Sequence, residues 1–329
     1  MNTSNNGTAA YVRNLTKVYK GGVRALDNIS FEVLEREIFG ILGPNGAGKS
    51  TLMKILSTLI SSTNGEVSIF SEPRPAADPR IRSIIGYLPQ DISSDSTLTG
   101  YENLLLSARL HGLWGSEMKK RIDEILKMMQ LTAAKDRLTS TYSGGMIRKL
   151  ELAQALVHTP KIILMDEPTV GLDPVARDSL IDEIRKLRER MGVTVILTTH
   201  YMEEADALCD RVAIMNRGRI AAIDSPQRLK ARVGKAVVTF EIGGSKRPRI
   251  KGMHFKNGVA TVASSTPDAD MPRYMKMLTS MGITVKSARA KEATLDDAFL
   301  KFTGGKLEDD VTTGWRDTKK ARRVMRRVA

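Results

Sequence analysis

A glycine-rich loop near the N-terminus has the residue types and spacing of a phosphate-binding site. Residues 43–51 read Gly-Pro-Asn-Gly-Ala-Gly-Lys-Ser-Thr, which fits the pattern G-x4-G-K-[ST]. The glycines let the main chain curl so that successive N–H groups point into the loop, and the N-terminus of a following helix adds positive potential. We expect Lys49 to reach terminal phosphates and Ser50 to face Mg²⁺.

Two adjacent carboxylates, Asp166 and Glu167, follow an apolar run at residues 162–165. A buried strand would deliver both to its carboxyl end, where ligands bind in open α/β sheets. An isolated Asp-Glu pair is more often part of a solvated loop. In a chain that already has a phosphate loop, the pair predicts a Mg²⁺ partner at Asp166 and a residue that polarises the attacking water at Glu167.

The segments around both motifs predict an α/β fold. Residues 38–42 form a short apolar run typical of a buried strand, and residues 51–59 carry leucine and isoleucine at helical spacing. Apolar runs return at 162–165 and 193–197, separated by a helix whose start is marked by Asp173 and a following proline. Strand, helix, strand in this order implies parallel pairing through a crossover.

A long stretch with a helical pattern, from Gln90 to Tyr142, lies between the apolar run at 38–42 and the one at 162–165. Thr99 and Glu102 form a capping-box signature ahead of an apolar helix face. This stretch indicates a helical insertion in the α/β domain. Further on, residues 211–223 are typical of a β-hairpin.

The composition predicts a packed protein of two domains. The chain has 329 residues, 41% of them hydrophobic, and a formal net charge of +14. The single cysteine, Cys209, excludes an intramolecular disulfide and a cysteine-based zinc module, and it favours a reducing compartment. No apolar stretch approaches the roughly 18 to 20 residues that span a bilayer, and the polar N-terminus is unlike a signal peptide. We therefore expect any membrane role to depend on a partner.

Residues 142–146 complete the pattern. They read Tyr-Ser-Gly-Gly-Met and precede an amphipathic helix, so Ser143 and two glycine amides would face an anion at a helix N-terminus. With these motifs in this order, approximately residues 11–233 resemble the ATP-binding cassette (ABC) ATPase subunits of transporters. The signature departs from the family at Met146, where glutamine is commoner. We expect this departure to alter dimer contacts more than hydrolysis.

The phrases GYLPQ, SGGM and EPTVGLDP, together with a C-terminal segment ending in EATLDDAFLKFTG, are most similar to drug-export cassettes of the daunorubicin-resistance type. The resemblance also assigns roles to single residues. Tyr19 would stack on adenine, and Gln90 would sense Mg²⁺ and link the core to the helical insertion. His200 would contact the terminal phosphate, and Asp173 would lie in the segment that crosses the dimer interface.

The site implied by the motifs and the resemblance has three groups of residues. The catalytic residues are Glu167 and His200. The nucleotide-binding residues are Tyr19, Gly43, Pro44, Asn45, Gly46, Ala47, Gly48, Lys49, Ser50, Thr51, Gln90, Ser143, Gly144 and Gly145. The metal-binding residues are Ser50, Gln90 and Asp166.

The resemblance implies a subunit that binds ATP with Mg²⁺ and hydrolyses it to drive export of a drug, an antibiotic or another hydrophobic compound. Its partners would be a second copy of the chain and a separate transmembrane permease. In the homodimer, each nucleotide would lie between the phosphate loop of one copy and the Ser143 loop of the other. The permease would rest in the groove beside Gln90 and residues 91–142. We expect the chain at the cytoplasmic face of the cell membrane, without a nucleic-acid partner.

Two other functions fit less well. A soluble ABC-type ATPase that acts on nucleic acid or ribosomes would need long heptad coiled coils or a second cassette, and the sequence between Gly43 and Asp166 has no sustained heptad. A non-enzymatic binding module would be expected to lose Glu167 or His200, and both are present. Neither the transported molecule nor the number of permease chains can be inferred from the sequence.

The fold class that follows is an α/β phosphate-loop core of the ABC type, with a mixed sheet and a helical subdomain, plus a small C-terminal α+β domain. The expected boundaries are 9–232 for the nucleotide-binding domain, about 91–160 for its helical subdomain, 233–304 for the accessory domain and 305–329 for a basic tail. The accessory domain could pack on the cassette or serve regulation. Methionines between 271 and 281 are expected to fill its core. The tail fits either a basic amphipathic helix on an anionic membrane or a solvated segment.

Overall fold

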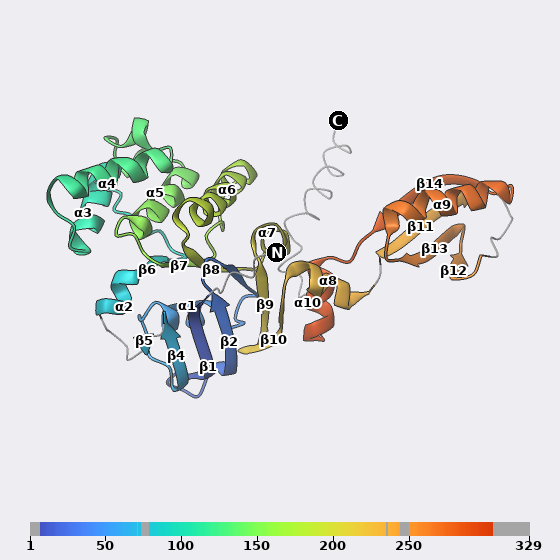
Figure 1. Ribbon diagram of the computed structural model, residues 1–329, viewed down its shortest axis with the longest axis horizontal. Coiled ribbons are helices and arrows are strands. Elements are labelled where there is room, and N and C mark those ends of the chain that lie inside the picture. The colour runs from blue at the N-terminus through green and yellow to red at the C-terminus, as the bar shows by residue number, and fades with distance from the viewer. Residues whose placement is uncertain (1–6, 71, 74–78, 235, 244–249, 305–329) are drawn as a thin grey trace, which may run out of the picture. The chain divides into compact units, whose positions relative to one another are not determined.

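The computed structural model describes residues 7–70, 72–73, 79–234, 236–243 and 250–304. Two compact units make up this chain, one that runs to Pro226 and one that begins at Gln227 (Figure 1). The basic tail expected at 305–329 lies outside the described residues. Each unit has a hydrophobic core of its own.

A six-stranded sheet forms the centre of the first unit, in the order β10-β9-β3-β8-β7-β6. From β9 to β6 neighbouring strands are parallel, and β10 pairs antiparallel with β9 at the edge. The strands are β3 Ile38–Leu42, β6 Ile85–Leu88, β7 Ile162–Asp166, β8 Thr194–Thr199, β9 Arg211–Asn216 and β10 Arg219–Asp224. Every residue of β3, β7 and β8 is buried, which explains their continuous apolar sequences. Parallel pairing of β7 with β8 and the β9–β10 hairpin are as predicted.

A second, antiparallel sheet has the order β2-β1-β4-β5. Its strands are β1 Thr8–Val18, β2 Arg24–Leu34, β4 Asn64–Ile69 and β5 Glu72–Pro73. Helix α1, Lys49–Leu56, packs against both β2 and β7 and so connects the two sheets. Short helix α2, Pro79–Ile84, leads into β6.

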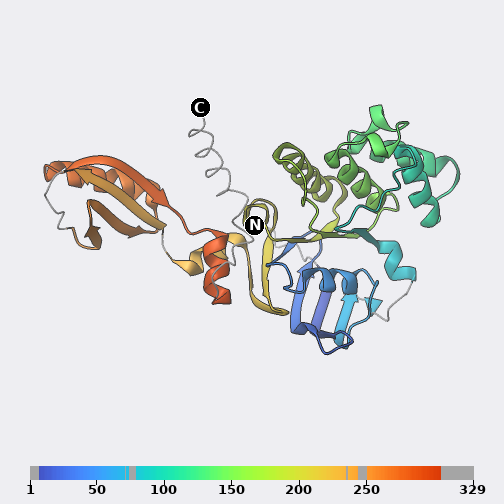
Figure 2. The same cartoon turned by 180° about the vertical axis from the view of Figure 1, so that it is seen from behind.

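Helices cover the six-stranded sheet on the side away from the antiparallel sheet, as both ribbon views show (Figures 1 and 2). They are α3 Gly100–Leu110, α4 Gly115–Met128, α5 Gly144–Leu156 and α6 Pro174–Met191, with short turns of 3₁₀ helix at Thr132–Ala134 and Thr139–Thr141. Helix α7, Met202–Leu208, follows β8 and contacts β3, β8 and α6.

Both predicted helix starts are confirmed. Glu102 N–H donates to Thr99 Oγ1 over 3.2 Å, and Thr99 N–H donates to Glu102 Oε2 over 2.8 Å, which is a complete capping box on α3. Asp173 Oδ1 accepts from the N–H groups of Val175 and Ala176 at the start of α6, each over 3.0 Å.

The second unit is an antiparallel sheet with the order β12-β13-β11-β14. Its elements are α8 Pro226–Val233, β11 Ala236–Gly243, β12 Met253–Lys256, β13 Val259–Ser264, α9 Pro267–Ser280, β14 Thr284–Lys291 and α10 Leu295–Thr303. Helix α9 packs against β11 and β14, and Phe240 and Leu278 are fully buried between them.

Of the methionines expected to fill the core of this unit, Met271 packs against it, but three others do not. Met275, Met277 and Met281 are 39%, 37% and 41% exposed. Leu278 is the buried residue of α9, and Met271 and Tyr274 of the same helix are partly buried against this core. The prediction of methionine core filler is therefore wrong at these three positions.

The chain's single cysteine lies at the end of α7. Cys209 is buried against Gly40 of β3, where any side chain at position 40 would collide with its Sγ atom. Burial raises the pKa of the Cys209 thiol, so the thiol stays protonated. Among the helices that the structure describes, none combines the length and apolarity needed to cross a membrane.

Candidate active site

The glycine-rich loop lies between the carboxyl end of β3 and the start of α1, as the sequence predicts. Gly48 forms the N-terminal cap of α1 with φ 102°, and Gly46 has φ 78°, conformations that favour glycine. A side chain at Gly43 would collide with the main-chain oxygen of Met215, and one at Gly48 would collide with that of Ala25. The loop is thus held from behind by β9 and β2. The N–H groups of Gly43 and Ala47 donate to the oxygens of Thr199 and Pro44, and the N-terminus of α1 supplies the anion cradle.

Lys49 lies inside this loop and is 4% exposed. Its Nζ donates to the main-chain oxygen of Gly43 over 2.8 Å and to that of Pro44 over 3.2 Å. The same ammonium group is 2.9 Å from Glu167 Oε1. Two sequence motifs separated by more than a hundred positions therefore meet in one buried ion pair.

Glu167 follows the last residue of β7 and is 5% exposed. It has φ 50°, an uncommon conformation for a residue with a side chain, and its N–H donates to Thr198 Oγ1 over 2.9 Å. Its second carboxylate oxygen lies 3.3 Å from His200 Nδ1. Strand ends β7 and β8 are adjacent in the sheet, which is why Glu167 and His200 come together.

The environment keeps the Glu167 carboxylate ionised. Burial alone would raise the pKa of Glu167, but the contacts with His200 and Lys49 outweigh it and lower the pKa to about 2. An ionised carboxylate at the end of a parallel strand can accept a proton from water or orient it. The geometry fits a residue that activates water for attack on a phosphate.

Asp166 and Ser50 supply oxygen atoms suited to Mg²⁺. Asp166 is 2% exposed, and its Oδ1 accepts from Thr198 Oγ1 over 2.6 Å. Ser50 lies in the first turn of α1 beside Lys49. Within the described residues no cluster of three or more His, Cys, Asp or Glu side chains could hold a metal alone. This donor set fits Mg²⁺, which takes one or two protein oxygens together with phosphates and water.

Tyr19 lies next to the loop, at the end of β1. Its hydroxyl is 3.3 Å from Thr51 Oγ1 on α1, and Lys17 Nζ lies 5.2 Å from the ring centroid. The side chain is 39% exposed. A half-exposed aromatic ring at the mouth of a phosphate cradle is well placed to stack on a base.

The turn at residues 143–145 and Gln90 are more exposed to solvent than the buried cluster of Lys49, Glu167 and Asp166. Ser143 caps α5 by accepting from Met146 N–H over 3.3 Å, and Ser143 and Gly144 are exposed. Gln90 is also exposed, and its main-chain oxygen accepts from Arg148 of α5. The described hydrogen bonds of Ser143 and Gln90 thus lie within α5 and the loop after β6.

A pair of buried charges ties that loop to α5, and the sequence reading did not find it. Arg148 Nη1 donates to Glu151 Oε2 over 2.9 Å and to the Pro89 oxygen over 3.1 Å. Glu151 Oε1 accepts from Ser93 N–H and, over 3.1 Å, from Ser93 Oγ. The loop at 89–94 is therefore fixed to the helix that begins at Ser143.

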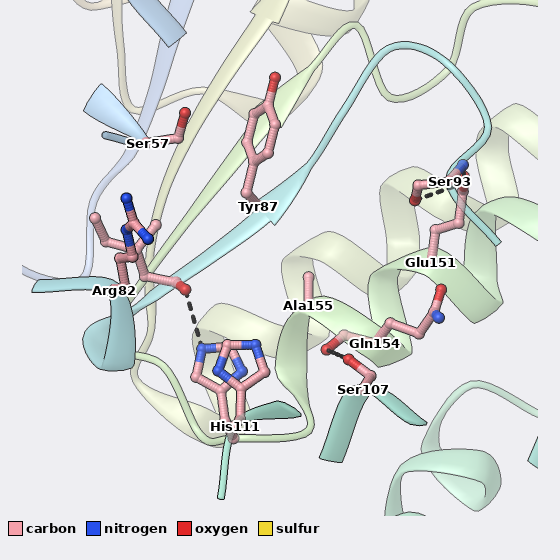
Figure 3. Close-up of a pocket in the computed structure, with 11 residues that line it drawn as sticks. Ser57, Arg82, Tyr87, Ser93, Ser107, His111, Glu151, Gln154 and Ala155 are labelled. Atoms are coloured by element: carbon pink, nitrogen blue, oxygen red, sulfur yellow. Dashed lines mark hydrogen bonds between the residues drawn. The ribbon is translucent and has the colours of Figure 1, made fainter. Parts of the chain in front are cut away.

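Next to this tether is a polar pocket of about 290 Å³ (Figure 3). It opens where α2 and β6 meet α3 and α5. The residues that line it are Ser57, Arg82, Ile85, Tyr87, Ser93, Ser107, His111, Glu151, Gln154, Ala155 and His158. Leu106 and Leu110 of α3 directly precede the pocket residues Ser107 and His111 in the sequence. The two leucines are 48% and 79% exposed.

Comparison with known proteins is consistent with this geometry. Residues 26–170 match the family model described as ABC transporter. The chain is 37% identical to the daunorubicin/doxorubicin resistance ATP-binding protein DrrA of Streptomyces peucetius, in an alignment covering 91% of this chain and 93% of the relative. It is 35% identical to the linearmycin resistance ATP-binding protein LnrL of Bacillus subtilis, covering 90% and 98%.

The chain belongs to the ABC transporter family. A further relative is the Nod factor export ATP-binding protein I of Sinorhizobium fredii, which is 34% identical over 94% of this chain and 90% of its own length. As an ABC protein, the chain is an ATPase that binds ATP with Mg²⁺. The sequence-based assignment of family, fold class, activity and cofactors is confirmed.

Solved ABC cassettes share the fold of this ABC ATPase. The structure of cbiO1 from Clostridium perfringens, part of the ABC transporter complex cbiONQ, matches with a TM-score of 0.64 and 29% identity, over 68% of this chain and 91% of that one. The dimeric post-hydrolysis structure of the cassette MJ0796 with ADP and Pi matches with a TM-score of 0.60 and 32% identity, over 66% and 98%.

Proposed function

We propose that this ABC ATPase powers the export of a drug, an antibiotic or another hydrophobic compound through a separate transmembrane permease. The observation that carries the proposal is the buried contact of Lys49, Glu167 and His200 beside a phosphate loop. Relatives named for daunorubicin, linearmycin and Nod factor handling support export as the direction. The chain would then lie at the cytoplasmic face of the membrane, bound there by its partner.

Each residue of the cluster has a proposed role in hydrolysis. Lys49 and the N–H groups of the loop bind the phosphates, and Tyr19 stacks on adenine. Glu167 orients and deprotonates the attacking water, and His200 contacts the terminal phosphate. Ser50, Asp166 and Gln90 hold Mg²⁺, which would neutralise charge on the phosphates.

Two copies of the chain are proposed to form the working unit. Ser143, Gly144 and Gly145 lie at an exposed helix N-terminus, which attracts an anion, and their described contacts do not extend to Lys49. A head-to-tail dimer would bring the Ser143 turn of one copy to the phosphate loop of the other. The dimeric structure of the MJ0796 cassette with ADP and Pi supports a dimer as the working unit.

The polar pocket is the proposed docking place of the permease. It is lined by both the core and the helical insertion, and exposed Leu106 and Leu110 provide apolar area for a protein partner. A partner bound in the pocket would contact the loop at 89–94, because Ser93 lines the pocket. Because Arg148 and Glu151 fix this loop to α5, a displacement there would reach Ser143.

The domain limits remain part of the proposal. We propose a nucleotide-binding domain at 9–232 with a helical subdomain at about 91–160, followed by an accessory domain at 233–304. The accessory domain has a core built around Phe240 and Leu278.

Co-purification tests the transporter function. Expressed in its own host with an affinity tag, the protein should bring down a polytopic membrane protein from detergent extracts. Leu110→Asp should abolish that association and leave basal ATP hydrolysis unchanged, because Leu110 is 79% exposed and outside the catalytic cluster. Val237→Asp, at an exposed apolar position of the second unit, is the matched control and should retain the membrane partner. Recovery of RNA or DNA instead would favour the soluble ATPase function.

A further inference from the structure

A second buried carboxylate lies behind the catalytic cluster. Glu204, on α7, is 5% exposed. Its Oε1 accepts from Thr169 Oγ1 over 2.6 Å, and its Oε2 accepts from Thr199 Oγ1 over 2.9 Å. Arg177 Nε lies 3.4 Å from Oε1 as a charge partner.

The groups around Glu204 come from three other segments of the fold. Thr169 lies two residues after Glu167, in the loop that follows β7. Thr199 ends β8 and immediately precedes His200. Arg177 is in the first turns of α6, which Asp173 caps, and its guanidinium lies 4.5 Å from the ring centroid of Tyr201.

The direct contact between Glu167 and His200 is too weak to fix their relative positions. At 3.3 Å, His200 Nδ1 makes a contact with Glu167 but no complete hydrogen bond, and among the described residues this buried nitrogen has no other partner. Lys49 holds the other oxygen of Glu167, and the Tyr201 ring lies beside His200 with centroids 4.2 Å apart. The rest of the alignment depends on the main chain that carries each residue. Thr198 already joins β8 to the Glu167 N–H, and Glu204 is a second side chain that joins the two main-chain segments, because one of its oxygens binds each of them.

We propose that Glu204 is a positioning residue for ATP hydrolysis, which fixes the loop carrying Glu167 against the strand end carrying His200. A carboxylate acceptor makes short, strong hydrogen bonds, and burial keeps water from competing for the two threonine hydroxyls. The contact with Arg177 extends the same link to the start of α6 and thus to Asp173. This proposal rests on the catalytic roles proposed for Glu167 and His200.

The first test removes both acceptor oxygens and keeps the length of the side chain. Glu204→Met should lower kcat for ATP by about tenfold or more, the usual effect of losing hydrogen bonds to a charged group. KM for ATP should change by less than about twofold, since Glu204 acts on the groups at the attacking water and the terminal phosphate, Glu167 and His200, and not on the phosphate loop or Tyr19. Glu204→Gln keeps one acceptor oxygen and should give an intermediate kcat.

The matched control is another buried carboxylate of the same unit. Glu183 on α6 is 2% exposed and accepts from Gln130 Nε2 over 3.0 Å. Glu183→Met makes the same chemical change away from the cluster and should leave kcat within about twofold, even if it lowers the melting temperature. Rates are expressed per nucleotide-binding site, so that unfolded protein does not count.

The second test separates hydrogen bonding from packing at Thr169. Thr169→Val keeps the shape but loses the hydroxyl, and Thr169→Ser keeps the hydroxyl but loses a methyl group. Positioning through Glu204 predicts that the serine variant retains kcat and the valine variant loses it. A packing role predicts the opposite order and would overturn the proposal.

The outcomes for Glu204 are kept apart from those for the catalytic site by measuring Glu167→Gln alongside. If Glu167→Gln hydrolyses ATP normally, the proposed catalytic role fails first. If Glu167→Gln is inactive while Glu204→Met has a normal kcat, only the positioning role is excluded. A loss in Glu204→Met that appears equally in Glu183→Met also excludes it, because the effect is then one of general stability.

Discussion

At the scale of single residues, the chemistry depends on how one carboxylate is kept charged inside the protein. Burial alone would raise the pKa of Glu167, but the contacts with His200 and Lys49 lower this pKa to about 2. Lys49 also binds the oxygens of Gly43 and Pro44, so phosphate would compete with Glu167 for the same ammonium group. Nucleotide binding and the freeing of the water-activating carboxylate are therefore linked.

Glu167→Gln should bind ATP but hydrolyse it about 10² to 10⁴ times more slowly, the range expected for loss of a general base. The amide keeps the shape and cannot take a proton. With Mg²⁺ and ATP the variant should accumulate as a closed dimer, measured by size-exclusion chromatography beside phosphate release. A normal turnover number would remove Glu167 from the catalytic role.

Lys49→Ala should lose nucleotide binding, because it removes the one ammonium group seen inside the described loop at 43–51. Titration with a fluorescent ATP analogue measures the effect directly. Lys54→Ala, at the end of the same helix α1, is the control and should bind normally. Unchanged affinity in Lys49→Ala would contradict the assignment of the phosphate loop.

The residues that bind ATP are predictable from the sequence because anion binding needs several groups in one short segment, as at 43–51. Glu204 and Arg148 were not, because each has a partner far away in the chain: Thr169 is 35 positions from Glu204, and Pro89 is 59 positions from Arg148. Two adjacent glutamates such as Glu203 and Glu204 are more common on a solvated helix face than inside a protein. A signal was present, since Glu204 lies four positions before the apolar Leu208 and so shares its helix face.

At the scale of elements, α5 connects the exposed turn at Ser143 to the pocket. Its C-terminal end carries His158, whose Nε2 lies 3.0 Å from the Ile85 oxygen and whose ring stacks on His111 with centroids 3.7 Å apart. Burial, with a smaller contribution from His111, lowers the pKa of His158 to about 4. His158 is therefore neutral in the folded protein at neutral pH.

This shift predicts a pH dependence of stability. In the unfolded chain His158 takes up a proton near its ordinary pKa of about 6.5, whereas the folded protein resists protonation until about pH 4. Stability should therefore fall as the pH is lowered between these two values. In His158→Phe that fall should be smaller, measured by urea unfolding at several pH values. Exposed His254→Phe should behave like the parent protein, and an equal effect in both variants would contradict the prediction.

Helices and strands that are marked by residues within their own segment were predicted from the sequence. Strands that depend on pairing with a distant strand were not. The capping residues Thr99 and Asp173 marked α3 and α6 correctly. Strand β4 was missed because it begins at Asn64 and Gly65, which are turn residues in most contexts. Gly65 fits there because a side chain would collide with the main chain of Asn14 on β1, a constraint that no local pattern contains.

At the scale of the whole molecule, each of the two units has its own buried cluster. The nucleotide site belongs entirely to the first unit, and Phe240 is the largest fully buried side chain of the second. Separate cores predict separate unfolding. Sequence composition indicated two domains, but the strand order of each sheet depends on long-range pairing and emerged only with the structure.

Calorimetry should therefore show two transitions. Mg²⁺ with ADP should raise the temperature of one transition only, because a ligand stabilises the unit that binds it. Phe240→Ala should destabilise the other transition by about 3 to 5 kcal/mol, the usual cost of truncating a buried phenylalanine. A single transition that both changes shift would contradict independent cores.

Because Cys209 is buried against Gly40, the native chain should not react with thiol-specific labelling reagents. A maleimide reagent needs an accessible thiolate, and this one is shielded and protonated. A cysteine placed at exposed Ser140, three residues before the turn at Ser143, would then carry a fluorescent dye or a cross-linker alone, without removal of Cys209. Approach of two copies during turnover could be followed in real time on an otherwise unaltered protein.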